Sequence, residues 1–183
     1  MKEIKTLTIE QYMDVLNIFE TFNQDENILT KELVKLFYGN ENIEIKQAKK
    51  LLSDLEILLL EETDFIQRFE FEGKEYGFIP NLDNITTAEY IDADNLMKNK
   101  TQNLHRIAAV LFRPITNKKG DMYQIEEYEG SIKYSEVMKK VDFKVIKGAM
   151  FFFAILSQEL MEISNTYIQR EKENLKKLIK ENN

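Results

Sequence analysis

Residues 80–114 decide the fold that the sequence predicts: PNLDNITTAEYIDADNLMKNKTQNLHRIAAVLFRP. Thr86 and Glu89 stand in capping-box spacing, which predicts a helix over residues 87–98. We expect Thr101 to cap a second helix that Pro114 ends, because proline lacks a backbone N–H and disfavours helical dihedrals at the residue before it. Apolar side chains cover most of this second helix, so it is predicted to be buried.

The composition is that of an ordinary globular protein. The chain has 183 residues, of which 43% are hydrophobic and 31% are charged, enough for one domain with a substantial core. Its net charge of −7 argues against nucleic acid as a direct ligand, because phosphates bind to a basic surface. The absence of cysteine excludes disulfides, thiolate catalysis and cysteine-based metal sites.

The hydropathy pattern predicts a protein without membrane contact. Residues 1–16 lack the continuous apolar core of a secretory signal. The longest apolar run, residues 149–156, is far shorter than the roughly 20 residues that a spanning helix needs.

Three helices are predicted in the first third of the chain. A capping box at Thr8 starts the first, Thr30 is expected to cap the second, and Gly39 ends it. Residues 45–60 have apolar side chains at helical spacing and form the third. Short polar connections between them predict an antiparallel bundle over residues 1–62.

Strand-forming residues flank the central helix pair. Residues 65–79 alternate about the turn Glu72-Gly73 and predict a β-hairpin. Residues 122–125, after a turn cluster, predict a second short β element. The pattern leaves open whether the two share one sheet or lie separately on helices.

The last third of the chain returns to helical spacing. Ser135 is expected to cap a short turn, and Asp142 a long helix from residue 143 towards Lys180. The apolar stripe of this helix resembles a coiled-coil seam and needs a partner. The residues expected to contact other chains are Phe151, Phe153, Ile168, Leu175 and Ile179.

Together these patterns predict a single α+β domain over residues 1–183 that is predominantly α-helical. It comprises an N-terminal three-helix bundle (1–62), a central buried helix pair flanked by short β-hairpins (63–130), and a C-terminal helical segment with a projecting end (131–183).

No reactive constellation is visible in the sequence. His105 is the only histidine and has no nucleophile near it in sequence, so a core or helix-surface histidine is the expected reading. Asp92 and Asp94 resemble the start of a calcium loop, but the turn glycine and the terminal glutamate are missing. No phosphate-binding glycine loop is present. We therefore expect no enzyme activity, no cofactor and no metal.

One stripe of positive charge stands out. Lys140, Lys144 and Lys147 lie on one helical face, with Lys139 beside them. This candidate basic patch suits an acidic neighbour or phosphates, whereas the simpler interpretation is a solvated face partly paired with Glu136 or Asp142.

Three segments carry a resemblance to a known group of proteins. FIPNLDNITTAEYIDADNL (78–96), NLHRIAAVLFRPI (103–115) and KKGDMYQIEEY (118–128) resemble small structural proteins of tailed bacteriophages, in particular crAss-like phages. The resemblance implies a virion protein assembled in the host cytoplasm, such as a ring or connector subunit of the head-to-tail apparatus. Its partners would be copies of itself and other virion or assembly proteins.

Two other functions stay open from the sequence. The first is a cytoplasmic assembly chaperone, cargo or adaptor protein that binds a partner through the C-terminal helix. The second is a small regulatory or nucleic-acid-associated protein that uses the lysine stripe, for which binding would depend steeply on salt.

Overall fold

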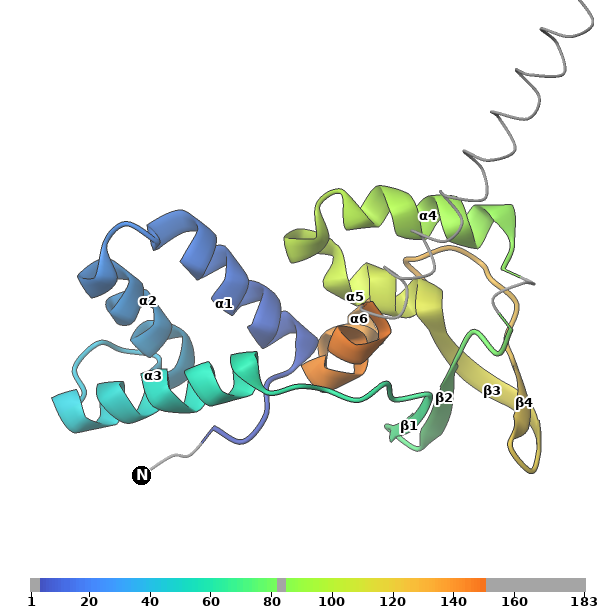
Figure 1. Cartoon of the computed structure of the whole chain (residues 1–183), viewed down its shortest axis with the longest axis horizontal. Helices are drawn as coiled ribbons and strands as arrows, with labels where there is room; N and C mark the ends of the chain where they lie inside the picture. The colour runs from blue at the N-terminus through green and yellow to red at the C-terminus, as the bar shows by residue number, and fades with distance from the viewer. Residues whose placement is uncertain (1–3, 82–84, 151–183) are drawn as a thin grey trace, which may run out of the picture.

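The computed structural model describes residues 4–81 and 85–150, and it has the mixed, mainly helical architecture that the sequence predicts. Three helices lie at one end of the molecule, and a sheet with further helices lies at the other (Figure 1). The elements are α1 Ile9–Phe22, α2 Glu26–Tyr38, α3 Ile45–Leu60, β1 Arg68–Phe71, β2 Lys74–Phe78, α4 Thr87–Met97, α5 Lys100–Leu111, β3 Phe112–Lys119, β4 Met122–Ile125 and α6 Ser135–Lys139. Residues 143–150 begin another helix.

The N-terminal bundle follows its capping residues. Thr8 starts α1 with the predicted capping box, Gly39 ends α2 in the left-handed conformation at φ 75°, and α3 has the predicted bounds. The prediction for the start of α2 is wrong. Asp25 is the N-cap, because its carboxylate accepts the backbone N–H groups of Asn27 and Ile28, and Thr30 lies inside the helix.

The strands form one antiparallel sheet with the order β1-β2-β3-β4, which settles the question that the sequence left open. Each outer pair is a hairpin whose turn contains a glycine at positive φ, Gly73 in one and Gly120 in the other. On one face of the sheet, the Phe112 ring meets the rings of Phe69 and Phe78 edge to face, with centroids 5.4 Å and 5.3 Å apart.

The end of α5 differs from the prediction. The helix stops at Leu111, and Phe112 already pairs with Phe78 as the first residue of β3. Pro114 therefore lies in a strand and does not end a helix. Its missing N–H is tolerated beside the bulge that follows directly in the β3–β4 pairing, and its carbonyl still accepts the backbone N–H of Glu126 at 2.9 Å.

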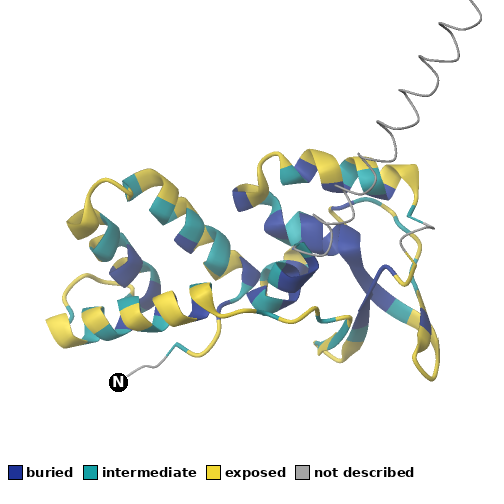
Figure 2. Cartoon of the chain, in the orientation of Figure 1, coloured by how far each residue is buried: buried dark blue, intermediate teal, exposed yellow. Residues whose placement is uncertain are grey.

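The predicted burial of α5 is confirmed, while its predicted cap is wrong. Figure 2 shows the dark blue of buried residues running through α5 into β3. Asn99 precedes the helix, and the Thr101 hydroxyl donates to Glu20 of α1 at 2.7 Å. Thr101 thus joins two helices where a local cap was expected.

A short pairing of the chain joins the bundle to the C-terminal helix. The Ile9 N–H donates to the Val141 carbonyl at 2.8 Å, and the Phe143 N–H donates to the Leu7 carbonyl at 2.9 Å. Asp142 caps the helix as predicted, because its carboxylate accepts the Lys144 N–H.

The other prediction for the C-terminal third needs a correction. Tyr134, and not Ser135, occupies the cap position of α6. Ser135 is the first residue of the helix, and its hydroxyl donates to the Ile132 carbonyl. The predicted continuation of the last helix towards Lys180 lies outside the described residues.

Candidate functional site

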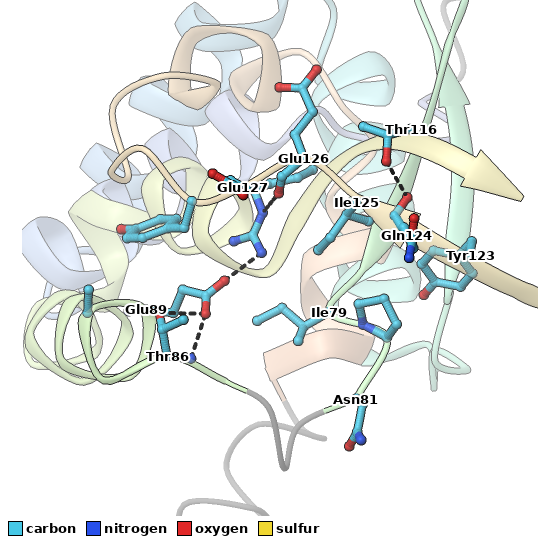
Figure 3. Close-up of a pocket in the computed structure, with 14 residues that line it drawn as sticks. Ile79, Asn81, Thr86, Glu89, Thr116, Tyr123, Gln124, Ile125, Glu126 and Glu127 are labelled. Atoms are coloured by element: carbon cyan, nitrogen blue, oxygen red, sulfur yellow. Dashed lines mark hydrogen bonds and ion pairs between the residues drawn. The ribbon is translucent and has the colours of Figure 1, made fainter.

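A cavity of about 940 Å³ opens between the N-terminus of α4, the chain after β2, and the β3–β4 hairpin (Figure 3). Its position follows from the fold, because β3 leaves α5 directly and carries Arg113 past the start of α4. The lining residues are Ile79, Pro80, Asn81, Thr86, Ala88, Glu89, Arg113, Thr116, Tyr123, Gln124, Ile125, Glu126, Glu127 and Tyr128.

A buried ion pair forms the base of this cavity. An Arg113 guanidinium nitrogen lies 2.5 Å from a Glu89 carboxylate oxygen, and the two side chains are 7% and 4% exposed. The guanidinium also donates to the carbonyls of Glu126 at 2.7 Å and Val110 at 3.2 Å. Its carbon lies 5.5 Å from the centroid of the Tyr128 ring. Arg113 thus directs its donors at groups of the same chain.

The other oxygen of the Glu89 carboxylate is held by the cap of α4. It accepts from the backbone N–H and from the hydroxyl of Thr86, both at 2.7 Å. Burial disfavours the charged carboxylate, but the Thr86 hydrogen bonds and the positive charge of Arg113 outweigh burial. The pKa of Glu89 is therefore lowered, and the group is ionised at neutral pH.

A strap, defined here as residues 126–134, closes one side of the cavity. The Tyr128 hydroxyl donates to Asp92 of α4, and the Arg106 guanidinium of α5 donates to the Ser131 hydroxyl at 2.9 Å. Burial, followed by the hydrogen bond to Asp92 and its negative charge, raises the pKa of Tyr128. The phenol stays protonated, and the strap is fastened to both central helices.

Only part of this site was predictable from the amino-acid sequence. Thr86 and Glu89 were identified as a capping box, which the structure confirms. The role of Arg113 was missed, although a lone cation in the apolar run 107–114 is a recognisable sign of a buried pair. The partner of Arg113 was not predictable from spacing alone, because α5 lies between the two residues.

The cavity combines an apolar floor with an ion pair at its base whose charged groups are already bound within the chain. Ile79 and Ile125 point into it, and the Tyr123 hydroxyl donates to the Phe78 carbonyl at 2.7 Å (Figure 3). The ion pair fixes the position of α4 against β3, because moving either element would expose an uncompensated charge to an apolar interior. The ion pair is therefore a structural contact between α4 and β3.

His105 does not line the cavity. It is half-buried on α5, with its Nδ1 atom 3.4 Å from the sulfur of Met13 on α1. Burial, followed by the charge of Lys139, lowers the pKa of His105, so the neutral imidazole is favoured. This placement agrees with the expected packing histidine.

The structure brings the predicted basic patch together with internal partners. Lys139 pairs with Glu136 at 2.8 Å, Lys140 with Glu72 at 3.6 Å, and Lys144 with Glu61 at 2.7 Å. The Lys147 ammonium donates to two carbonyls at the end of α3, those of Leu59 at 2.9 Å and Glu61 at 2.6 Å. Lys144 and Lys147 therefore tie the last helix to the bundle.

The predicted interface residues Phe151, Phe153, Ile168, Leu175 and Ile179 lie outside the described residues. Across residues 4–81 and 85–150, no helix is long and apolar enough to span a membrane. Over the same ranges, no group of three or more acidic or histidine side chains is arranged to hold a metal ion.

Comparisons with protein-family models, with curated proteins and with solved structures give no significant match to this chain.

Proposed function

We propose that this protein is a non-enzymatic structural subunit that acts by packing against other proteins, in a ring or connector of the head-to-tail apparatus of a tailed phage. The observation that carries the packing role is a set of large apolar side chains on the surface. Ile45, Ile57 and Leu60 of α3 are exposed, as are Met122 at the tip of a hairpin and Ile132 in the strap. Ile57 and Leu60 lie one turn apart on α3, and neighbouring exposed apolar side chains commonly mark sites of protein contact.

The charged groups of the cavity base and of the lysine stripe, unlike the exposed apolar side chains, are bound within the chain, and this contrast supports the same proposal. The ionic groups at the base of the cavity bind one another, and the lysine stripe binds carboxylates and carbonyls of the same chain. The exposed isoleucines of α3 have no such internal role. The phage setting rests on the sequence resemblance over residues 78–128.

Two measurements test the proposal. Size-exclusion chromatography with light scattering, on the purified full chain alone and mixed with its particle partners, is expected to give assemblies with a fixed number of copies. A chain that stays monomeric in both samples contradicts the structural role.

Mass spectrometry of purified mature particles then tests the location. A virion subunit is expected at constant stoichiometry in every particle. Detection in assembly intermediates but not in mature particles would contradict a virion subunit and would favour an assembly chaperone or adaptor.

A further inference from the structure

One face of α3 is open to solvent along the whole helix. Ile45, Ile57 and Leu60 on this face are 76%, 63% and 75% exposed. Leu51 and Leu55, on the opposite side of the helix, are buried in the core. Figure 2 shows exposed residues, in yellow, recurring along α3. The helix therefore carries large apolar side chains on its outer face as well as on its core face.

The exposed residues of α3 form one stripe. With 3.6 residues per turn, they fall within an arc of about 120° whose members lie opposite the buried leucines. They are Ile45, Lys46 and Lys49 before Ser53, and Glu56, Ile57 and Leu60 after it. This stripe is called the outer face of α3 below.

The charges of the outer face are divided between its two halves. Lys46 and Lys49 lie before Ser53, and Glu56 lies after it. Within the described part of the chain, none of these three charges takes part in an ion pair. The basic half and the acidic half are therefore both available to a partner.

A groove of about 630 Å³ between α2 and α3 borders the outer face. Its lining mixes apolar side chains with two glutamates and two lysines, and Lys31 is already paired with Glu41 at 3.0 Å. Because its charges balance, the groove itself selects no partner by charge.

The outer face is complementary to itself. In an antiparallel pair of α3 helices with a two-fold axis beside Ser53, Lys49 lies four residues before the axis and Glu56 three residues after it. The two therefore oppose each other, and Ile45 and Leu60 do so in the same way, eight and seven residues from Ser53. The small side chain of Ser53 lets the two helices approach closely at the axis. A two-fold contact of this kind uses the same surface on both copies.

Resting on the packing role proposed above, we propose that α3 of one copy binds α3 of a second copy in an antiparallel, two-fold contact. Lys49 of each copy then pairs with Glu56 of the other, and the apolar side chains at the two ends of the helix are covered. The contact extends over a helix of 16 residues, about 24 Å long. It joins subunits in pairs, and other surfaces arrange the pairs in an assembly.

Exchanging the charges tests this contact. Lys49→Glu and Glu56→Lys, each in the full-length chain, put like charges opposite each other twice in a dimer, and each should weaken self-association by about tenfold in sedimentation equilibrium. An equimolar mixture of the two variants should associate as tightly as the unaltered chain, because every opposed pair in the mixed dimer again has opposite signs. Lys119→Glu is the matched control, at an exposed lysine of β3 outside the outer face.

Cysteine cross-linking gives an independent measurement, because the chain has no cysteine of its own. Ser53→Cys places one thiol of each copy beside the two-fold axis, so a short bismaleimide should yield a covalent dimer. Asn17→Cys, at an exposed position of α1, is the control and should stay uncross-linked under the same conditions.

The other outcomes overturn the inference in distinguishable ways. A dimer that responds equally to Lys49→Glu and Lys119→Glu, or that stays weak in the mixture, contradicts the α3 contact and leaves the proposed function standing. A chain that is monomeric alone but assembles with its particle partners does the same, and it assigns the outer face to a different protein if Lys49→Glu weakens that assembly. A chain that is monomeric in both samples contradicts the contact and the proposed function together.

Discussion

The cavity beside the sheet and the groove of the N-terminal bundle differ in what lines them. The cavity beside the sheet has an ionic base in which Arg113 and Glu89 hold each other and the surrounding backbone. The groove of the bundle mixes apolar side chains with polar and charged ones at its surface, and it has an exposed isoleucine, Ile45, at its edge. A buried charge must be neutralised within the chain because its desolvation costs several kcal/mol, whereas an exposed isoleucine is tolerated until a partner covers it. The difference separates a site whose charges hold the fold together from one whose apolar edge stays open to solvent.

The largest effect is expected at the ionic base. Arg113→Ala leaves the Glu89 carboxylate buried without its cation, and should lower the free energy of unfolding by about 3–5 kcal/mol. Urea denaturation measures the change. The double variant Glu89→Leu with Arg113→Met is the control and should be considerably more stable, because it removes both charges together. A loss below about 1 kcal/mol for Arg113→Ala would contradict a structural role for the pair.

A smaller loss is expected where the last helix touches the connection between α3 and β1. A methyl group added at Gly148 would lie 2.6 Å from the Asp64 carbonyl oxygen, which is backbone and yields little. Gly148→Ala should destabilise by about 1–3 kcal/mol. Glycine-to-alanine changes in a helix normally stabilise by about 0.5–1 kcal/mol, so a gain in the denaturation midpoint would contradict this close approach.

The lysine stripe provides a matched pair of variants. Lys147→Met removes the ammonium that binds the carbonyls of Leu59 and Glu61, and should cost about 1 kcal/mol, because a cation at a helix C-terminus is stabilising. Lys140→Met, at a residue whose side chain is 66% exposed, should change stability by less than about 0.5 kcal/mol. Equal losses in thermal or urea unfolding would contradict the internal role of Lys147.

The smallest effect is expected from titration of His105. Its pKa is lowered in the folded protein, so the unfolded chain binds the proton more tightly, and stability should fall as the pH drops below the ordinary histidine value of 6.5. His105→Gln should flatten the dependence of unfolding free energy on pH between about 7.5 and 5.5. An unchanged slope would contradict the shift.

The lowered pKa of Glu89 affects stability at a more acidic pH than that of His105. The folded state holds the carboxylate charged, so its contribution is present above the ordinary value of 4.5 and is lost as the pH falls through the lower folded pKa. Keeping the His105 measurement above about pH 5 separates the two groups.

Local chemistry explains which parts of the fold were predictable. The caps at Thr8 and Thr86 were found because each depends on atoms three residues apart. Thr30 and Asp25 are both suitable cap residues by type, and in the structure Asp25 caps α2. Pro114 predicts a helix stop, but the helix ends three residues earlier because Phe112 pairs with Phe78 of β2, which local spacing does not show. Strand pairing overrode helical spacing there.

The candidate sites, too, were predictable only where they depend on contacts close in sequence. The capping role of Glu89 was predictable, but its pairing with Arg113 was not, because the turn between α4 and α5 brings the two residues together. The lysine stripe was recognised as a cationic face, yet its partners Glu61 and Glu72 lie far away in the chain. The groove between α2 and α3 was not predicted, because only the packing of the two helices leaves Ile45 at an open edge.

The sequence by itself determined the mixed helical and strand character, the starts of α1 and α4, and the whole extent of α3. These depend on hydrogen bonds and side-chain spacing within one or two turns. The tertiary structure alone decided the strand order, the ionic base of the cavity and the use of Lys147 at the end of α3, a contact between residues 88 positions apart. Contacts of that separation depend on how all the intervening elements pack, and no local pattern records it.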